Sequence, residues 1–160
     1  MLNITVIHVG SFKEKYLDEA FSEYVKRISG YAKFEDVTLK ETFLPDNPTS
    51  VEIERALSDE AKLILPRLDP RAKKIALCVE GKLLSSEELA EVIDKAPLEG
   101  ASKIIFIIGS SYGLSDEVKK AADIRLSFSK MTFPHQLIRV ILSEQIYRAL
   151  TINAKGRYHK

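Results

Sequence analysis

The sequence predicts a single α/β domain over residues 1–160, with a mainly parallel sheet covered by helices on both faces. Five β-rich segments alternate with five amphipathic segments, which is the pattern of such folds. Two of the strand segments, Lys74–Val79 and Lys103–Ile108, are continuous apolar runs typical of parallel strands buried on both faces. No linker, repeat or low-complexity tract divides the chain, and its 45% apolar content is enough for one core.

The first third of the chain predicts a strand, a helix and a second strand. Apolar residues alternate over Leu2–Val9 and stop at Gly10-Ser11. A helix is expected over roughly Lys13–Ser29, where apolar residues recur with helical period, and Gly30 ends it. The second strand is Phe34–Thr42. The single apolar face of the helix predicts that it packs on the sheet.

Two capping boxes mark the starts of the next helices. The pattern Thr49–Glu52 opens a helix that runs to about Leu65, where Pro66 stops it. The pattern Ser85–Glu88 opens another helix through about Ala96. In each box a side-chain oxygen accepts from a backbone amide that would otherwise lack a partner, so both starts are well defined.

The remaining elements follow from apolar runs and helix-start signals. The third strand, Lys74–Val79, is expected to end in a turn over Glu80–Lys82. After the fourth strand, Ser115 can cap a short helix, and Asp123–Ser129 reads as the fifth strand. The last helix is expected over Pro134–Ile152, because proline is favoured in a first helical turn.

The last helix is apolar around most of its circumference. A helix that closes a small domain should have a broad solvated face. This one has only a narrow polar stripe, His135, Arg139 and Ser143, beside the pair Glu144 and Arg148. The surplus apolar surface predicts that a second copy of the chain covers the helix, as a homodimer.

Three strand ends predict a ligand site. Parallel strands bring Leu77–Gly81, Ile108–Gly113 and Phe128–Phe133 to one edge of the sheet, where open α/β sheets bind small ligands. The third segment carries Met131 and Phe133 where phosphate-binding loops carry glycine, which favours a wall for a flat apolar group. A turn that simply fills the core explains the same residues equally well.

Charge is unevenly distributed along the chain. The net charge is only +1, too small for a general nucleic-acid coat. Residues 130–160, however, hold six Lys or Arg residues and one acid, which indicates a face for an anionic partner. A last helix and tail whose basic residues only face solvent, without binding a partner, would give the same count of charges.

Several functional classes find no support in the sequence. His8, His135 and His159 are the only histidines and form no metal-binding pattern with the single cysteine, so no metal is expected. Cys78 lies in an apolar run and is expected to be buried. There is no serine-hydrolase elbow and no apolar run near the roughly 20 residues that span a bilayer. We expect a cytoplasmic protein without a membrane segment.

The whole chain resembles the RlmH-type ribosomal RNA methyltransferases of the SPOUT superfamily. The terminal tail and the block from Leu126 to Val140 are the most specific parts of the resemblance. The motifs that carry it are Val9-Gly10, Glu80-Gly81-Lys82 with Ser85-Ser86, Ile108-Gly109 through Gly113-Leu114, LSFSKMTFPHQLIRV, Glu144-Gln145-Ile-Tyr-Arg148 and Tyr158-His159-Lys160.

The resemblance implies a C-terminal trefoil knot, a homodimer, S-adenosylmethionine as methyl donor, and N3-methylation of pseudouridine 1915 in 23S rRNA, within the large subunit or the assembled ribosome. Carried over by position, the cofactor contacts fall on Leu77, Gly109, Phe128, Ser129, Lys130, Met131, Thr132 and Phe133. The candidate catalytic residues are His159, Arg157, Tyr158, Arg139 and His135, the tail residues being expected from the partner chain.

One departure and two alternatives accompany this interpretation. Many relatives have Gly-Gly after the fourth strand, whereas this chain has Gly109-Ser110, and a serine forced to positive φ would be strained. A non-catalytic nucleotide-binding module of flavodoxin-like shape would use the same glycine loops but needs no basic tail. A protein-interaction dimer with an inert pocket would explain only the apolar last helix.

Overall fold

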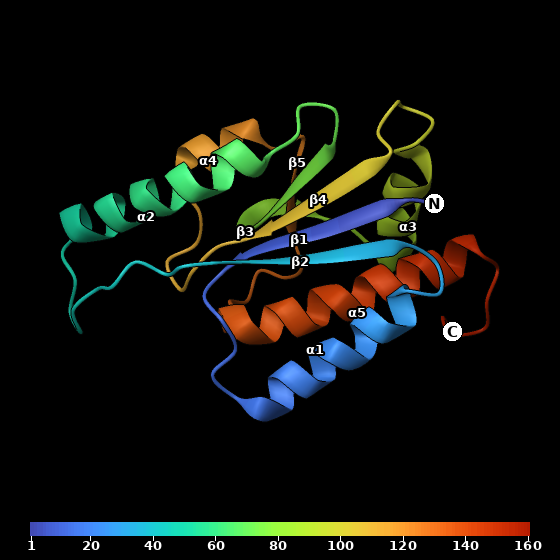
Figure 1. The fold of residues 1–160 in the computed structure, drawn as a ribbon, viewed down its shortest axis with the longest axis horizontal. Helices are drawn as coiled ribbons and strands as arrows, with labels where there is room; N and C mark the ends of the chain where they lie inside the picture. Colours follow the sequence, from blue (N-terminus) through green and yellow to red (C-terminus); the bar gives the residue numbers. More distant parts are fainter.

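The computed structural model describes residues 1–160 and contains one five-stranded sheet in which every pairing is parallel (Figure 1). The spatial order is β2-β1-β4-β3-β5. The strands are β1 (Asn3–Val9), β2 (Lys33–Leu39), β3 (Lys73–Leu83), β4 (Lys103–Ile108) and β5 (Ile124–Ser127). Five strands and a parallel sheet were predicted, and both predictions are confirmed.

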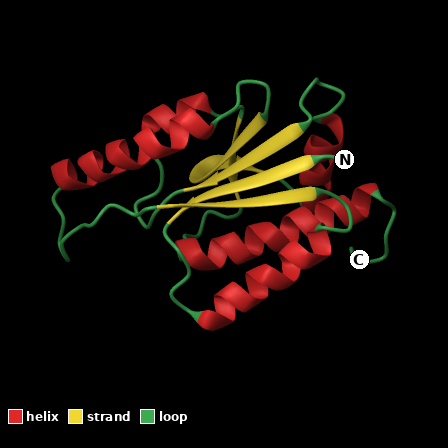
Figure 2. Cartoon of the chain, in the orientation of Figure 1, coloured by secondary structure: helices red, strands yellow, loops and turns green.

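Helices cover both faces of the sheet, as Figures 1 and 2 show. One layer packs on the larger buried cluster of apolar residues and the other layer on the smaller. The first layer holds α1 (Lys15–Ile28), α3 (Ser86–Lys95) and α5 (His135–Asn153), and the second holds α2 (Ser50–Ile64), a short 3-10 turn (Leu65–Arg67) and α4 (Asp116–Ala121). The core is therefore divided by the sheet, and β4 is buried on both sides.

The helix starts lie where the capping signals placed them. Thr49 and Ser85 each accept a hydrogen bond from the backbone amide three residues later, and the carboxylate of the glutamate at that position accepts one from the backbone amide of the cap residue. The hydroxyl of Ser115 likewise accepts from the amide of Val118 at 3.3 Å. These contacts are local in sequence, which is why residue types alone located them.

Strands β3 and β5 differ from the prediction at the edge of the sheet. Instead of turning at Glu80–Lys82, β3 continues to Leu83, because Leu77 and Lys82 both pair with Leu126 and the residues between them bulge outward. Strand β5 ends at Ser127, two residues early. There the Ser127 hydroxyl donates to the carbonyl of Ser129 at 2.9 Å, a turn contact in place of strand pairing.

Two of the three residues of the polar stripe of α5, Arg139 and Ser143, are buried, contrary to the interpretation of the stripe as the solvated face of the helix. Arg139 is only 6% exposed, and its Nη2 donates to Asp36 Oδ2 at 2.7 Å. Its guanidinium carbon lies 3.9 Å from the ring centre of Phe12 and 4.3 Å from that of Phe21. These partners are remote in sequence, so helical periodicity could not reveal that this polar side faces the protein.

His8 completes the same buried network on the sheet. Its Nδ1 lies 2.8 Å from the carbonyl oxygen of Gly10, and its Nε2 lies 2.9 Å from Asp36 Oδ1. His8 is itself buried on β1, with only 2% of its surface exposed. The network joins the end of β1 to β2 and, through Asp36, to α5.

Replacing Arg139 with alanine should lower the free energy of unfolding by about 3 kcal/mol, because the change removes the partner of Asp36 and the contact with two aromatic rings. Urea unfolding followed by circular dichroism measures this. Arg27→Ala is the control, since its ion pair with Glu23 is exposed and its loss should change the stability little. Equal small losses in both variants would contradict the structural role of Arg139.

Candidate functional site

The three predicted strand-end segments enclose one cavity of about 290 Å³. It lies where β3, β4 and β5 end, which in Figure 1 is the end of the sheet away from the chain's two termini. Seven of the eight predicted cofactor-contact residues line it: Leu77, Gly109, Phe128, Ser129, Met131, Thr132 and Phe133. Lys130, the eighth, is exposed and does not line the cavity.

A tight backbone turn forms the wall that follows β4. The amide of Gly113 donates to the carbonyl of Ser110 at 2.9 Å, and Gly113 has φ +84°, which a glycine adopts readily. A Cβ placed on Gly109 would lie 2.1 Å from the carbonyl oxygen of Gly113. Ser110 does not have positive φ, because Lys155 is the only non-glycine residue that does. The strain considered for Ser110 is therefore absent.

The wall that follows β5 is an exposed loop that presents large side chains. The hydroxyl of Ser129 accepts from the amide of Met131 at 3.0 Å and fixes the turn. Met131 is 75% exposed and Phe133 is 36% exposed, and both line the cavity. A turn that simply fills the core would bury these side chains, so the structure favours the alternative of a wall for a ligand.

An ion pair that the sequence did not suggest lies at the cavity. Lys119, on α4, pairs with Glu80, on the bulge of β3, and both residues line the cavity. The hydrogen bond from Lys119 holds the pKa of Glu80 below its ordinary value. Lys119 was missed because nothing in a short polar helix indicates which of its lysines faces a cavity.

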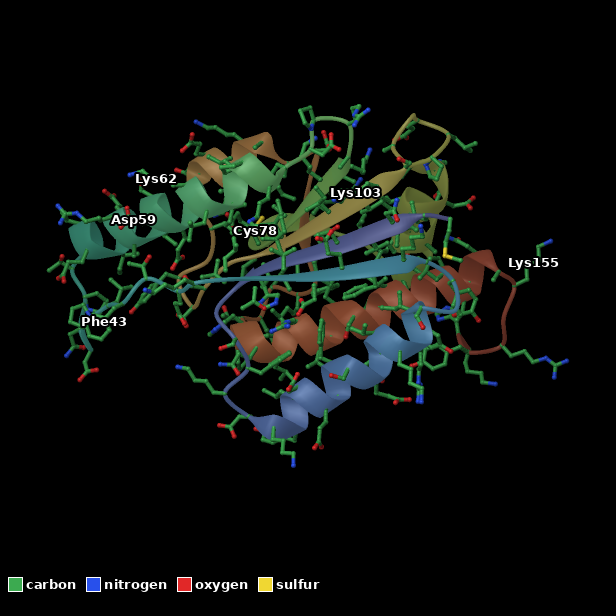
Figure 3. The ribbon with its side chains drawn as sticks, in the orientation of Figure 1. Phe43, Asp59, Lys62, Cys78, Lys103 and Lys155 are labelled. Atoms are coloured by element: carbon green, nitrogen blue, oxygen red, sulfur yellow. The ribbon has the colours of Figure 1, made fainter.

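Cys78 also lines the cavity and is half-buried, so the expectation of a fully buried thiol is wrong (Figure 3 labels it on β3). The physical reason is the bulge that begins after Leu77, which turns the strand out of the sheet. Burial still raises the pKa of the Cys78 thiol, so the group is a poor nucleophile near neutral pH.

Only one of the five candidate catalytic residues, His135, lines the cavity of its own chain. Its Nδ1 lies 3.3 Å from the hydroxyl of Ser111 on the opposite wall. Burial holds the pKa of His135 below its ordinary value, and Glu41 opposes that shift. The imidazole is therefore neutral near pH 7. Arg139 lies one helical turn further along α5, in the buried network described above.

The terminal tail folds back on its own chain, away from the cavity. The Tyr158 hydroxyl donates to Glu144 Oε1 at 3.0 Å, and its ring lies 4.7 Å from that of Tyr147. His159 Nε2 lies 2.7 Å from Glu87 Oε1. Glu144 is nine residues beyond His135, roughly 14 Å along the helix. Within one chain the tail therefore does not reach the cavity.

Burial, followed by the hydrogen bond to Glu144, raises the pKa of Tyr158 to about 12. The phenol therefore keeps its proton at neutral pH and acts as a hydrogen-bond donor. Arg157, between this docked tyrosine and the end of α5, is exposed.

Two further features bear on chemistry. No group of three or more His, Cys, Asp or Glu residues is arranged to hold a metal ion. None of the helices is both long enough and apolar enough to cross a bilayer. The polar groups that line the cavity include backbone of the three loops, the Glu80–Lys119 pair, His135 and several hydroxyl-bearing residues, among them Ser111 and Thr132.

Comparison with known proteins gives matches over the whole chain. The protein from Bacillus pumilus named ribosomal RNA large subunit methyltransferase H is 46% identical over 99% of this chain and 100% of its own. The protein of the same name from Pelotomaculum thermopropionicum is 48% identical over 99% of both chains. A crystal structure of a probable methyltransferase from Bordetella pertussis has a TM-score of 0.57 at 13% identity, over 93% of this chain and 96% of that one.

The fold of these neighbours carries the C-terminal trefoil knot that the resemblance implied. A family model described as "Predicted SPOUT methyltransferase" matches residues 2–159. Sequence, fold and the position of the cavity thus agree, and the chain belongs to the SPOUT methyltransferase family.

Proposed function

We propose that this chain transfers a methyl group from S-adenosylmethionine to N3 of pseudouridine 1915 in 23S ribosomal RNA, in the large subunit or the assembled ribosome. The observation that supports this most is the cavity, which lies between the three predicted segments of a SPOUT chain. Relatives named as large-subunit rRNA methyltransferases support the RNA substrate. Because the proposed substrate is ribosomal RNA, we also propose a cytoplasmic location.

The residues of the cavity suit the proposed donor. Leu77, Ile108 and Phe133 offer apolar contact to an adenine ring, and the turn over residues 109–113 offers backbone groups to its polar edge. When bound, S-adenosylmethionine supplies a methyl group already activated by its sulfonium. The chain's own task is then to orient the acceptor and to exclude water.

The acceptor nitrogen is an imide N–H that must lose its proton as the new N–CH₃ bond forms. His135 is the residue of this chain best placed to take that proton. Its Nδ1–H can donate to the Ser111 hydroxyl, which leaves the Nε2 lone pair as the acceptor. The low pKa of His135 keeps the ring neutral and ready to accept a proton near pH 7.

Transfer of labelled methyl from S-adenosylmethionine to ribosomes that lack the modification tests the function directly. We expect one methyl group per ribosome, which mass mapping of the RNA places on pseudouridine 1915. His135→Ala should lower the rate constant by about a hundredfold with little effect on donor affinity, as for loss of a general base. Binding of the donor without any transfer would favour a non-catalytic nucleotide-binding module instead.

The second part of the proposal is that the protein works as a homodimer through α5. Leu137 is 38% exposed, and Val140 and Ile141 are only half-buried, although all three are apolar. Ile138, beside Leu137, lines the cavity. A partner that covers this surface would therefore stand at the mouth of the cavity, where its own tail could contribute.

Leu137→Asp should dissociate the dimer without unfolding the chain, because this side chain is already partly solvated in one subunit. Leu142→Asp serves as the contrast, since Leu142 is fully buried and its replacement by an unpaired charge should unfold the protein. Sedimentation and circular dichroism separate the two effects. A wild-type protein that sediments as an 18.0 kDa monomer at micromolar concentration would refute the homodimer.

The third part is that the tail completes the partner's site. Arg157 can bind RNA phosphate, while Tyr158 and His159 can contact a flipped-out base, together with Arg139 if its network opens. The tail lies roughly 14 Å along α5 from its own cavity, which supports a role in the cavity of a partner instead.

Deletion of Arg157–Lys160 should abolish methyl transfer but leave dimerisation and most of the donor affinity intact. Mixing the deleted chain with a Gly109→Val chain tests whether the site is shared. A shared site restores part of the activity, because one cavity and one tail are then both intact in the heterodimer. A verified heterodimer without activity would rule the shared site out.

A further inference from the structure

Helix α2 buries a carboxyl group that the fold does not need. Glu60 is only 3% exposed, and the apolar residues Ala56, Ala61 and Ile64 are buried on the same helix. No lysine, arginine or histidine forms an ion pair with it. A buried carboxyl without a cation is costly and calls for a specific reason.

The two oxygens of Glu60 face two different loops. Oε2 accepts from the backbone amide of Thr42, in the segment between β2 and α2, at 3.2 Å. Oε1 is buried and has no hydrogen-bond partner. The hydroxyl of Ser110 lies against the same carboxyl group. Ser110 is itself buried and belongs to the turn over residues 109–113 that forms one wall of the cavity.

The surroundings of the carboxyl favour its neutral form. Burial raises the pKa of Glu60, and the negative charges of Glu41 and Asp59 raise it further. The Thr42 amide and the Ser110 hydroxyl act in the opposite direction. A neutral carboxyl has one oxygen that accepts and one hydroxyl that donates. In Glu60 these would be Oε2, which accepts from Thr42, and Oε1, which has no partner.

We propose that Glu60 is a positioning residue for the cavity wall, donating a hydrogen bond from a protonated Oε1 to Ser110 while Oε2 accepts from the Thr42 amide. In this way α2 holds the turn over residues 109–113 in place from behind. The inference rests on the proposed function, because the wall that Glu60 holds belongs to the proposed donor site.

If the proposal holds, the affinity for the methyl donor falls as the pH rises. Because the folded-state pKa of Glu60 lies above its ordinary value of 4.5, the neutral form and its hydrogen bond are complete below that value. The neutral form is lost as the pH rises through the folded-state pKa, and the hydrogen bond then reverses, with the Ser110 hydroxyl donating to the carboxylate. Above it, a carboxylate would face Glu41 and Asp59 with no cation, and the turn would loosen.

Calorimetry with S-adenosylhomocysteine between about pH 5 and pH 8.5 tests this. Wild-type affinity should weaken by about fivefold across the range, because ionisation leaves an unpaired buried charge beside two other carboxylates. Glu60→Gln should bind tightly and without that pH dependence, because an amide has the same donor and acceptor. Ser110→Ala should bind weakly throughout. All variants retain His135, which also lines the cavity. The difference in pH dependence between wild type and Glu60→Gln therefore reports on Glu60 alone.

Glu54→Gln is the matched control, a carboxylate on the same helix that is exposed and whose charge is not among those that shift the pKa of Glu60. It should keep the wild-type pH dependence. Equal pH dependence in wild type and Glu60→Gln, or none in wild type, would overturn the proposal.

Hydrogen exchange of the amides of residues 110–113 provides a readout that needs no ligand. Protection should fall with rising pH, after correction for the intrinsic rate, in wild type but not in Glu60→Gln. If no variant binds the ligand but this difference persists, the proposed donor is wrong and the positioning role stands. If the ligand binds and the difference is absent, the positioning role is wrong and the donor site stands.

Discussion

Two places where backbone meets backbone, with no room for a Cβ atom, determine the shape of this molecule's site. A Cβ on Gly81 would lie 2.7 Å from the carbonyl oxygen of Arg125, and one on Gly109 would lie 2.1 Å from that of Gly113. The first contact lets β5 pair with β3 on both sides of its bulge. The second closes the turn after β4. Without these approaches, the three strand-end segments would stand too far apart to enclose a cavity.

The buried network of His8, Asp36 and Arg139 fixes α5 relative to these walls. The first turns of α5 carry His135 and Ile138, which line the cavity, and Arg139 follows directly. A guanidinium that pairs with a carboxylate and packs against two aromatic rings has few alternative geometries, so the network sets the rotation of the helix. That rotation places the apolar residues around Leu137 outward and beside the cavity. The same anchoring thus serves both the proposed donor site and the proposed dimer surface.

The sequence was sufficient for features that depend on local contacts or on strand direction. The strands, both capping boxes and the meeting of Leu77, Gly109 and Phe128 at one edge followed from periodicity and from parallel pairing. It failed where partners are distant: Arg139 binds a residue 103 positions away, and β3 is lengthened by pairing with β5. Lys119 and Glu60 gave no signal, since helical pattern does not identify which polar residue faces a cavity or a loop. The knot came only from resemblance to a known family.

The central claim is that the three strand ends form the methyl-donor site. A crystal structure of the protein with S-adenosylhomocysteine tests it most directly. We expect the adenine ring between Leu77, the turn over residues 109–113 and the loop that ends at Phe133, with Gly109 in van der Waals contact. A ligand bound at any other place, with this cavity empty, would refute the proposed donor site.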